Sequence, residues 1–278
     1  GYDLETNKFS MVDTDSKFLT NAPTTQYARL TDYGTLPFLN AFPLASDEVD
    51  WITITYYNDG GSLGSESINN QDATGGASSV GSYSNTRLLY FGAFPGNLKN
   101  WSSTFATAVT NNLTYYTVQA KNPSQSQLYT INILCPNLKG YEAIRLTWLN
   151  QWGVWDYYTF NMKSIRTVTT KRTPYTQMEG TWNDSTFKIA GYKGGKKNFR
   201  VNATEKIKIN TDFVSESEGV WFEELINSTE VYIVNGFSDD VANAITNKYI
   251  EPVVLTTSSY IKKTIANDRL MQYTFEVE

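Results

Sequence analysis

The sequence contains no histidine and a single cysteine, Cys135. Without histidine, one chain cannot form a Ser-His-Asp or Cys-His nucleophile, a His-ligated zinc site or a 2-His-1-carboxylate iron site. A single thiol also excludes an internal disulfide framework and a thiolate zinc site. Any enzyme would have to rely on carboxylate, lysine or tyrosine chemistry. We therefore predict that the chain is not an enzyme and that it holds no metal or cofactor.

Charged residues and long apolar runs are also scarce. Charged residues make up 18% of the 278 residues, and we expect the net charge of −5 to be spread along the chain. No basic block stands out that could follow a phosphate backbone, so we expect no direct nucleic-acid binding. No apolar run approaches the roughly twenty residues that a membrane-spanning helix needs, so we expect no membrane partner.

Aromatic, β-branched and small polar residues are abundant. Aromatics account for 14% of the chain, and nineteen of them are tyrosine. This composition is typical of half-buried β-sheets joined by polar loops. Runs that predict strands lie at residues 51–57, 87–91, 113–120, 127–135, 231–235, 252–257 and 270–278. We predict a mainly β fold of two β-sandwich-like units with one short covering helix.

The two units are expected to meet near residues 136–140. We assign residues 1–137 to an N-terminal β-rich domain and residues 138–278 to a C-terminal β-rich domain. Residues 58–85 are rich in Gly, Ser and Asn and predict a long loop. A loop of that length inside a compact domain is usually functional or disordered. The run Pro-Gly-Asn-Leu-Lys at residues 95–99 predicts a shorter loop.

The predicted helix covers about residues 215–227. Ser215 and Glu218 have the spacing of a capping box. Val220, Trp221 and Leu225, with Phe222 as a further candidate, would then face the sheet and make the helix amphipathic. The four glutamates of this segment could alternatively supply an acid/base pair for glycoside hydrolysis, which requires two carboxylates on facing elements. We favour acids on the helix surface; the four are Glu216, Glu218, Glu223 and Glu224.

Residues 144–162 are the least generic segment, with three Trp, two Tyr and a Phe within nineteen residues. Alternation on both flanks predicts two strands joined by a short turn that contains Gly153. The aromatics occupy both alternation phases, so we expect both faces of this hairpin to be covered. A sugar-binding platform is the competing interpretation, but we favour core and interface packing. The candidate residues are Trp148, Asn150, Trp152, Gly153, Trp155, Asp156, Tyr158 and Phe160, together with Trp221.

The same segment carries a family resemblance. Residues 146–160 fit the pattern Leu-x-Phe/Trp-Leu-Asn-x-x-Gly-x-Trp/Gln-Asp-x-x-x-Phe. Together with residues 18–23, 221–233 and 270–278, this pattern resembles a family of structural virion proteins of tailed bacteriophages, found in crAss-like and other Bacteroidetes phages and in marine phages. The matching stretches touch both ends and the middle of the chain.

The resemblance implies a non-enzymatic structural component of a virion, associated with the tail, neck or baseplate, and it implies no catalytic residues. We expect the chain to reside in the virion and to bind other virion proteins and copies of itself in a symmetric homo-oligomer. Residues 58–85 and the N-terminal segment are expected to order against such neighbours. The alternative is an adhesin that binds a host surface glycan or receptor through exposed Trp and Tyr.

Overall fold

The computed structural model describes residues 18–39, 51–69, 88–121, 127–134, 140–180, 185–186, 188, 194–236, 249–259, 261 and 271–278. Strands make up 51% and helices 14% of the described residues, which confirms the predicted mainly β fold. There are two buried hydrophobic clusters. One is formed by side chains between residues 18 and 131, and the other by Ala22 and side chains between residues 144 and 277. The predicted domain boundary and Cys135 lie outside the described residues.

The first unit is built on a five-stranded sheet in the order β1-β7-β6-β3-β4, in which β1 and β7 are parallel and the other pairs antiparallel. Its strands are Thr25–Ala28, Tyr129–Ile133, Tyr115–Lys121, Trp51–Asn58 and Gly61–Asn69 in that order. Two short strands pair beside it, β2 (Leu36–Leu39) and β5 (Leu88–Phe91). Alternate side chains of β3 are buried, which places one face of this sheet in the core.

The prediction of a loop over residues 58–85 is wrong for residues 61–69, because Gly61–Asn69 forms β4 and pairs with β3. Because β4 has few large apolar side chains, its backbone pairing with β3 is what stabilises it. Glu66 adds a polar link, since its carboxylate accepts hydrogen bonds from Tyr56 Oη and from Ser102 Oγ. Residues 70–87 lie outside the described residues.

Two helices of the first unit were not predicted. Residues 95–99 begin α1 (Pro95–Trp101) instead of forming a loop, because proline at the first helical position is compatible with a helix start. Helix α2 (Ser103–Thr110) follows directly, and Ser102 Oγ caps it by accepting a hydrogen bond from Phe105 N. Leu98 and Phe105 are buried in the first hydrophobic cluster.

The second unit contains a four-stranded sheet in the order β13-β12-β8-β9. Its strands are Ile250–Val253, Val231–Val234, Ile144–Leu149 and Trp155–Phe160 in that order. A three-stranded sheet follows the order β10-β11-β14, with strands Ile165–Gln177, Gly195–Asn210 and Thr274–Val277. In β8 the first five side chains are all buried, so both faces of this strand are covered as predicted.

The predicted helix of the second unit is confirmed as α3 (Glu216–Asn227) with its capping box. Ser215 N donates to Glu218 Oε2 at 2.8 Å, and Glu218 N donates to Ser215 Oγ at 3.3 Å. Trp221 and Leu225 are buried as expected, but Val220 is 54% exposed. Trp221, Phe222 and Leu225 define the buried stripe, and Val220 lies outside it.

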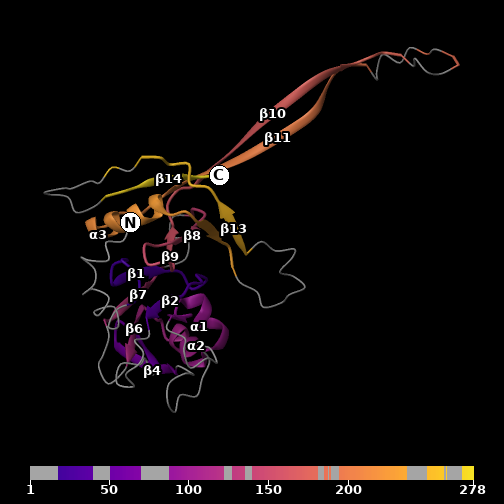
Figure 1. The fold of residues 1–278 in the computed structure, drawn as a ribbon. Helices are drawn as coiled ribbons and strands as arrows, with labels where there is room; N and C mark the ends of the chain where they lie inside the picture. Colours follow the sequence, from indigo (N-terminus) through magenta and orange to yellow (C-terminus); the bar gives the residue numbers. More distant parts are fainter. Residues whose placement is uncertain are drawn as a thin grey trace.

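Strands β10 and β11 form a long two-stranded hairpin that projects from the body of the molecule (Figure 1). We call these two strands, Ile165–Gln177 and Gly195–Asn210, the arm. All side chains of β10 except that of Gln177 are exposed. At its base the arm is tied to the body by pairing of β11 with β14 and by an ion pair from Arg166 to Glu142. Arg166 also forms an ion pair with Glu205 of β11, which joins the two strands of the arm.

Candidate functional site

The Asn150 side chain stabilises the turn between β8 and β9 in the aromatic hairpin. The Asn150 side-chain oxygen accepts hydrogen bonds from Trp152 N at 2.9 Å and from Val154 N at 3.2 Å. Its Nδ2 donates to the carbonyl of Leu19 at 2.9 Å, which attaches the turn to the N-terminal segment. Gly153 closes the turn with φ +75°, a left-handed conformation that glycine adopts without strain. The sequence Asn-x-x-Gly therefore specifies this turn by a local hydrogen-bonding mechanism.

One face of the hairpin carries aromatics into the second hydrophobic cluster. Trp148 is fully buried, and its ring lies 4.9 Å from that of Trp221. Tyr158 meets Phe160 edge to face at 4.9 Å and Phe222 at 4.8 Å. Helix α3 thus covers this face with its own aromatic side chains, in geometries that aromatic pairs prefer.

Asp156 lies on the same face of the hairpin, and its carboxylate is buried. Its Oδ2 accepts a hydrogen bond from Trp221 Nε1 at 2.7 Å. Burial raises the pKa of Asp156 to about 7, although hydrogen bonds from Trp221 and Thr20 act in the opposite direction. The folded protein therefore takes up a proton here at a pH where an unfolded chain, with an aspartate pKa near 4, remains ionised.

This proton uptake predicts a pH dependence of stability. Because the folded pKa is above the unfolded one, the free energy of unfolding should fall as pH rises from about 4 to about 7. Asp156→Asn keeps an oxygen for Trp221 Nε1 and removes the titration. Relative to this variant, the wild type should lose about 3 kcal/mol across that window in urea denaturation. Parallel pH profiles of the two proteins would contradict the assignment.

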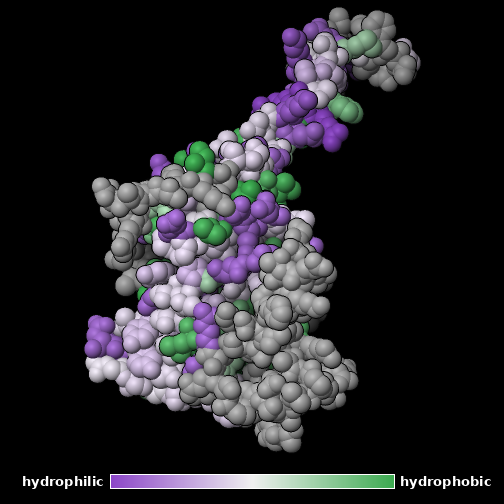
Figure 2. Space-filling model, turned by 60° about the vertical axis from the view of Figure 1, so that its left-hand side comes forward, coloured by the Kyte–Doolittle hydropathy of each residue, from purple (hydrophilic) through white to green (hydrophobic). Residues whose placement is uncertain are grey.

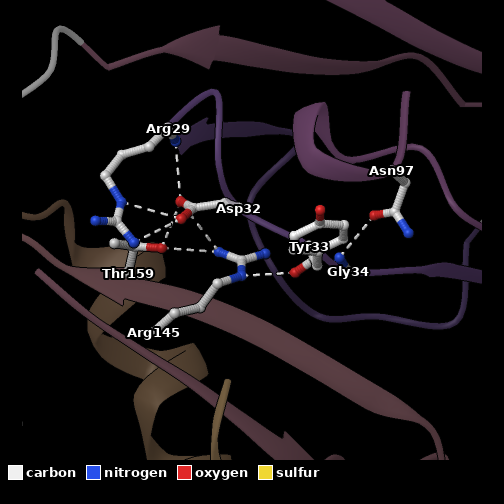
Figure 3. Close-up of polar contacts among 7 residues, drawn as sticks. All are labelled: Arg29, Asp32, Tyr33, Gly34, Asn97, Arg145 and Thr159. Atoms are coloured by element: carbon white, nitrogen blue, oxygen red, sulfur yellow. Dashed lines mark hydrogen bonds and ion pairs between the residues drawn. The ribbon is translucent and has the colours of Figure 1, made fainter. Parts of the chain in front are cut away.

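The opposite face of the hairpin meets the first unit through a buried ionic cluster (Figure 3). Arg145 of β8 lies 3.6 Å from Asp32 Oδ2 through its Nη1, and its Nε donates to the Tyr33 carbonyl at 2.7 Å. Thr159 of β9 accepts from Arg145 Nη1 at 2.8 Å and donates to Asp32 Oδ2 at 2.7 Å. Arg29 completes the cluster with an ion pair to Asp32 Oδ1 at 2.8 Å.

Aromatic rings enclose the Arg145 guanidinium. Its Cζ lies 4.7 Å from the Phe94 ring centroid and 5.3 Å from that of Tyr157, a cation–π arrangement. Burial lowers the pKa of Arg145, while the neighbouring Asp32 raises it. Burial would raise the pKa of Asp32, but Arg145 and Arg29 outweigh it and lower that pKa below its usual value. The cluster therefore joins the two units as an ion pair removed from solvent.

The predicted site residues separate into three groups in the structure. Trp148, Asp156, Tyr158, Phe160 and Trp221 come together on the α3 side. Asn150 and Gly153 form the turn, and Trp152 lies beside them half-buried. Trp155 points to the other face, where its ring meets Tyr232 edge to face at 5.5 Å.

Arg145 was not predicted as a site residue, although the sequence contains a signal for it. A cation between Ile144 and Leu146, in a strand whose two faces are covered, must find a counter-charge. Nothing in the sequence identifies Asp32 as that counter-charge, because 113 residues separate the two positions. Asp32 lies in a turn whose packing against β8 appears only in the fold.

A groove of about 470 Å³ opens at the junction of the two units. Trp155, Tyr157 and Tyr232 line one side of it, and residues 33–35 line the other. Thr147 also lines the groove, and its buried Oγ1 has no hydrogen-bond partner among the described residues. The groove thus combines aromatic surfaces with a hydroxyl that a ligand could engage.

A second hollow, of about 580 Å³, lies beside α3. Val220, Glu223 and Glu224 line it from the helix, and Asn21 lines it from the N-terminal segment. Asn21 Nδ2 donates to Glu224 Oε1, while Glu224 Oε2 is buried without a hydrogen-bond partner that meets normal geometry in the described structure. Burial raises the pKa of Glu224. The four glutamates considered for glycoside chemistry all lie on this single helix.

Comparison with known protein families and with curated proteins finds no match for this chain. Among the described residues, no helix is long and apolar enough to cross a membrane. Within the same ranges, no group of three or more Cys, Asp and Glu side chains is placed to hold a metal ion.

Proposed function

We propose that this chain is a non-enzymatic structural component of a tailed-phage virion, in the tail, neck or baseplate, and that it acts through protein–protein interfaces. The arm is the observation that carries the proposal. It is a two-stranded hairpin with thirteen residue pairs, and an isolated hairpin of two strands is marginally stable in water. A partner that covers the arm would stabilise it.

The arm also exposes apolar side chains that a partner would bury. Val168 is 61% exposed, Val201 51% and Phe199 81%. Val168 and Arg172 lie four residues apart in β10, and Val201 pairs with Arg172, so the two valines share one face of the hairpin. Figure 2 shows scattered green hydrophobic residues among the purple hydrophilic residues of the arm. A partner that covers the arm would remove these side chains from water, which favours association.

Contacts between the two units favour a structural role, because they hold the units in a fixed arrangement. The Arg145 cluster and the Asn150 turn fasten the first unit to the second, so that the arm extends from a single compact body. The resemblance of residues 146–160 to virion proteins is in keeping with this design, because those residues build the joint. The partners would be other virion proteins and copies of this chain arranged about a symmetry axis.

The proposal is tested on particles. Purified virions should contain this chain in a fixed stoichiometry by quantitative mass spectrometry, and antibody labelling should place it at the tail, neck or baseplate. Pull-down from disrupted virions with the full-length chain should recover particular virion proteins. Intact particles that lack the chain would overturn the proposal.

The groove favours a second candidate function, an adhesin that binds a host glycan. Trp155 and Tyr232 would stack against a sugar ring, and Thr147 Oγ1 would accept or donate a hydrogen bond. Trp155→Ala and Tyr232→Ala are then expected to weaken binding on a glycan array by roughly tenfold each. Trp101→Ala is the matched control, because Trp101 is an exposed aromatic on α1 outside the groove. A wild-type chain that binds no glycan would remove this candidate.

A further inference from the structure

The charges of the chain are strongly segregated once the arm is recognised. Residues 165–210, which comprise the arm and the segment between its strands, contain ten Lys and Arg against three Asp and Glu, a net charge of +7. The rest of the chain contains thirteen against twenty-five, a net charge of −12. The expectation of evenly spread charge is therefore wrong, because the small total conceals two opposite regions.

The basic side chains lie along both faces of the arm. Lys171 pairs with Asn202, and Arg200 pairs with Thr173 two positions further along the same face. Arg172 lies on the opposite face beside Val201. The ion pairs of the arm described above, from Arg166, are at its base, where the hairpin joins the body. The outer part of the arm thus presents cations and apolar side chains to whatever covers it.

The acidic counterpart is the region of α3. Residues 211–230 contain six Asp and Glu and no Lys or Arg. The hollow beside the helix is lined by Glu223 and Glu224, and Glu224 Oε2 is the buried oxygen without a partner of normal geometry. Val220 at the same hollow is 54% exposed, and Phe213 before the helix is 57% exposed. This surface combines acids with apolar side chains, as the arm combines bases with apolar side chains.

We propose that the arm of one copy docks on α3 of a second copy, with Lys171 and Arg200 against the acidic hollow. The inference rests on the proposed assembly function and names its partner. The arm leads away from the body that carries its own α3 (Figure 1), so the docking site belongs to another copy. Thirteen residues of β10 extend roughly 40 Å, enough to cross a neighbouring domain of ~30 Å.

A nucleic acid is the other acidic surface that a basic β-ribbon could bind. The arm fits it less well, because Val168, Val201 and Phe199 would find no apolar partner along a phosphate backbone. The remaining net charge of −12 would also repel it. A second copy of the chain supplies both the acids and the apolar side chains.

Charge reversal tests the docking on the full-length chain. Lys171→Glu with Arg200→Glu reverses the arm, and Glu216→Lys with Glu223→Lys reverses the α3 side. Each double variant alone should weaken self-association by at least roughly tenfold in sedimentation velocity. An equimolar mixture of the two should associate again, since the reversed arm then meets a reversed α3. Higher salt should weaken the wild-type association because the charges are exposed.

Matched controls separate this contact from general charge effects. Lys99→Glu on α1 and Asp59→Lys in the β3–β4 turn change exposed charges away from both surfaces and should leave self-association unchanged. Circular dichroism melting should show that all variants fold. A monomeric wild type, or reversed variants that associate normally, would overturn the docking while leaving incorporation into virions to its own test. Loss of binding to a DNA duplex in the arm variant, with self-association intact, would overturn it in favour of nucleic acid.

Discussion

Trp148→Ala is expected to lower the free energy of unfolding by about 3–5 kcal/mol. Trp148 is fully buried, its ring contacts Trp221, and β8 is covered on both faces. Removal of the indole would leave a cavity between the sheet and α3. This cavity could close only if one of the two elements moved toward the other. The cost should appear as a lower denaturation midpoint in guanidinium with a similar slope.

Trp148→Phe is the matched control. The Trp148 Nε1 is buried and has no hydrogen-bond partner in the described structure, so phenylalanine loses part of the packing and no hydrogen bond. We expect it to cost clearly less than the alanine variant. If Trp148→Ala melts like the wild type and only sugar binding fails, Trp148 serves a ligand platform and its placement in the core is wrong.

The aromatic hairpin could be predicted because its signals are local. Alternation in β8 and β9, together with the Asn150 and Gly153 turn, specifies the two strands without help from the rest of the chain. The capping box of Ser215 specified the start of α3 for the same reason. Local hydrogen bonding and side-chain periodicity can be recognised in a sequence.

Features that depend on distant partners were missed. Strand β4 has few large apolar residues and exists because β3 offers it an edge. Helix α1 begins at a proline that the sequence equally favours in a loop. The arm was not predicted as an exposed hairpin, because its exposure depends on the absence of any covering layer in the described fold. The Trp155 groove likewise requires residues 33–35, more than a hundred positions away.

Asp32→Asn is the other change with a large expected effect, about 3–5 kcal/mol of lost stability. The variant keeps the shape of the side chain but leaves the buried Arg145 cation without its counter-charge. Because Arg145 and Asp32 come from different units, we also expect a less cooperative thermal transition in calorimetry. Glu142→Gln breaks the exposed ion pair to Arg166 and should cost less than ~1 kcal/mol.

A double-mutant cycle isolates the pair. Arg145→Met removes the cation, so the double variant Asp32→Asn with Arg145→Met should be more stable than the sum of the two single effects implies. Additive effects would show that the two side chains act independently, in contradiction to the cluster in Figure 3.

The pH dependence distinguishes this carboxylate from Asp156. The pKa of Asp32 is lowered in the folded protein, so its contribution is fully present above the unfolded aspartate value of about 4 and is lost as pH falls through the folded pKa. The stability difference between wild type and Asp32→Asn should therefore shrink in acid, whereas the Asp156→Asn difference changes between about pH 4 and 7. The pKa values of the two aspartates, which lie at opposite faces of one hairpin, are thus shifted in opposite directions. Arginine partners lower the pKa of Asp32, whereas Asp156 has neutral donors in a buried site and its pKa is raised.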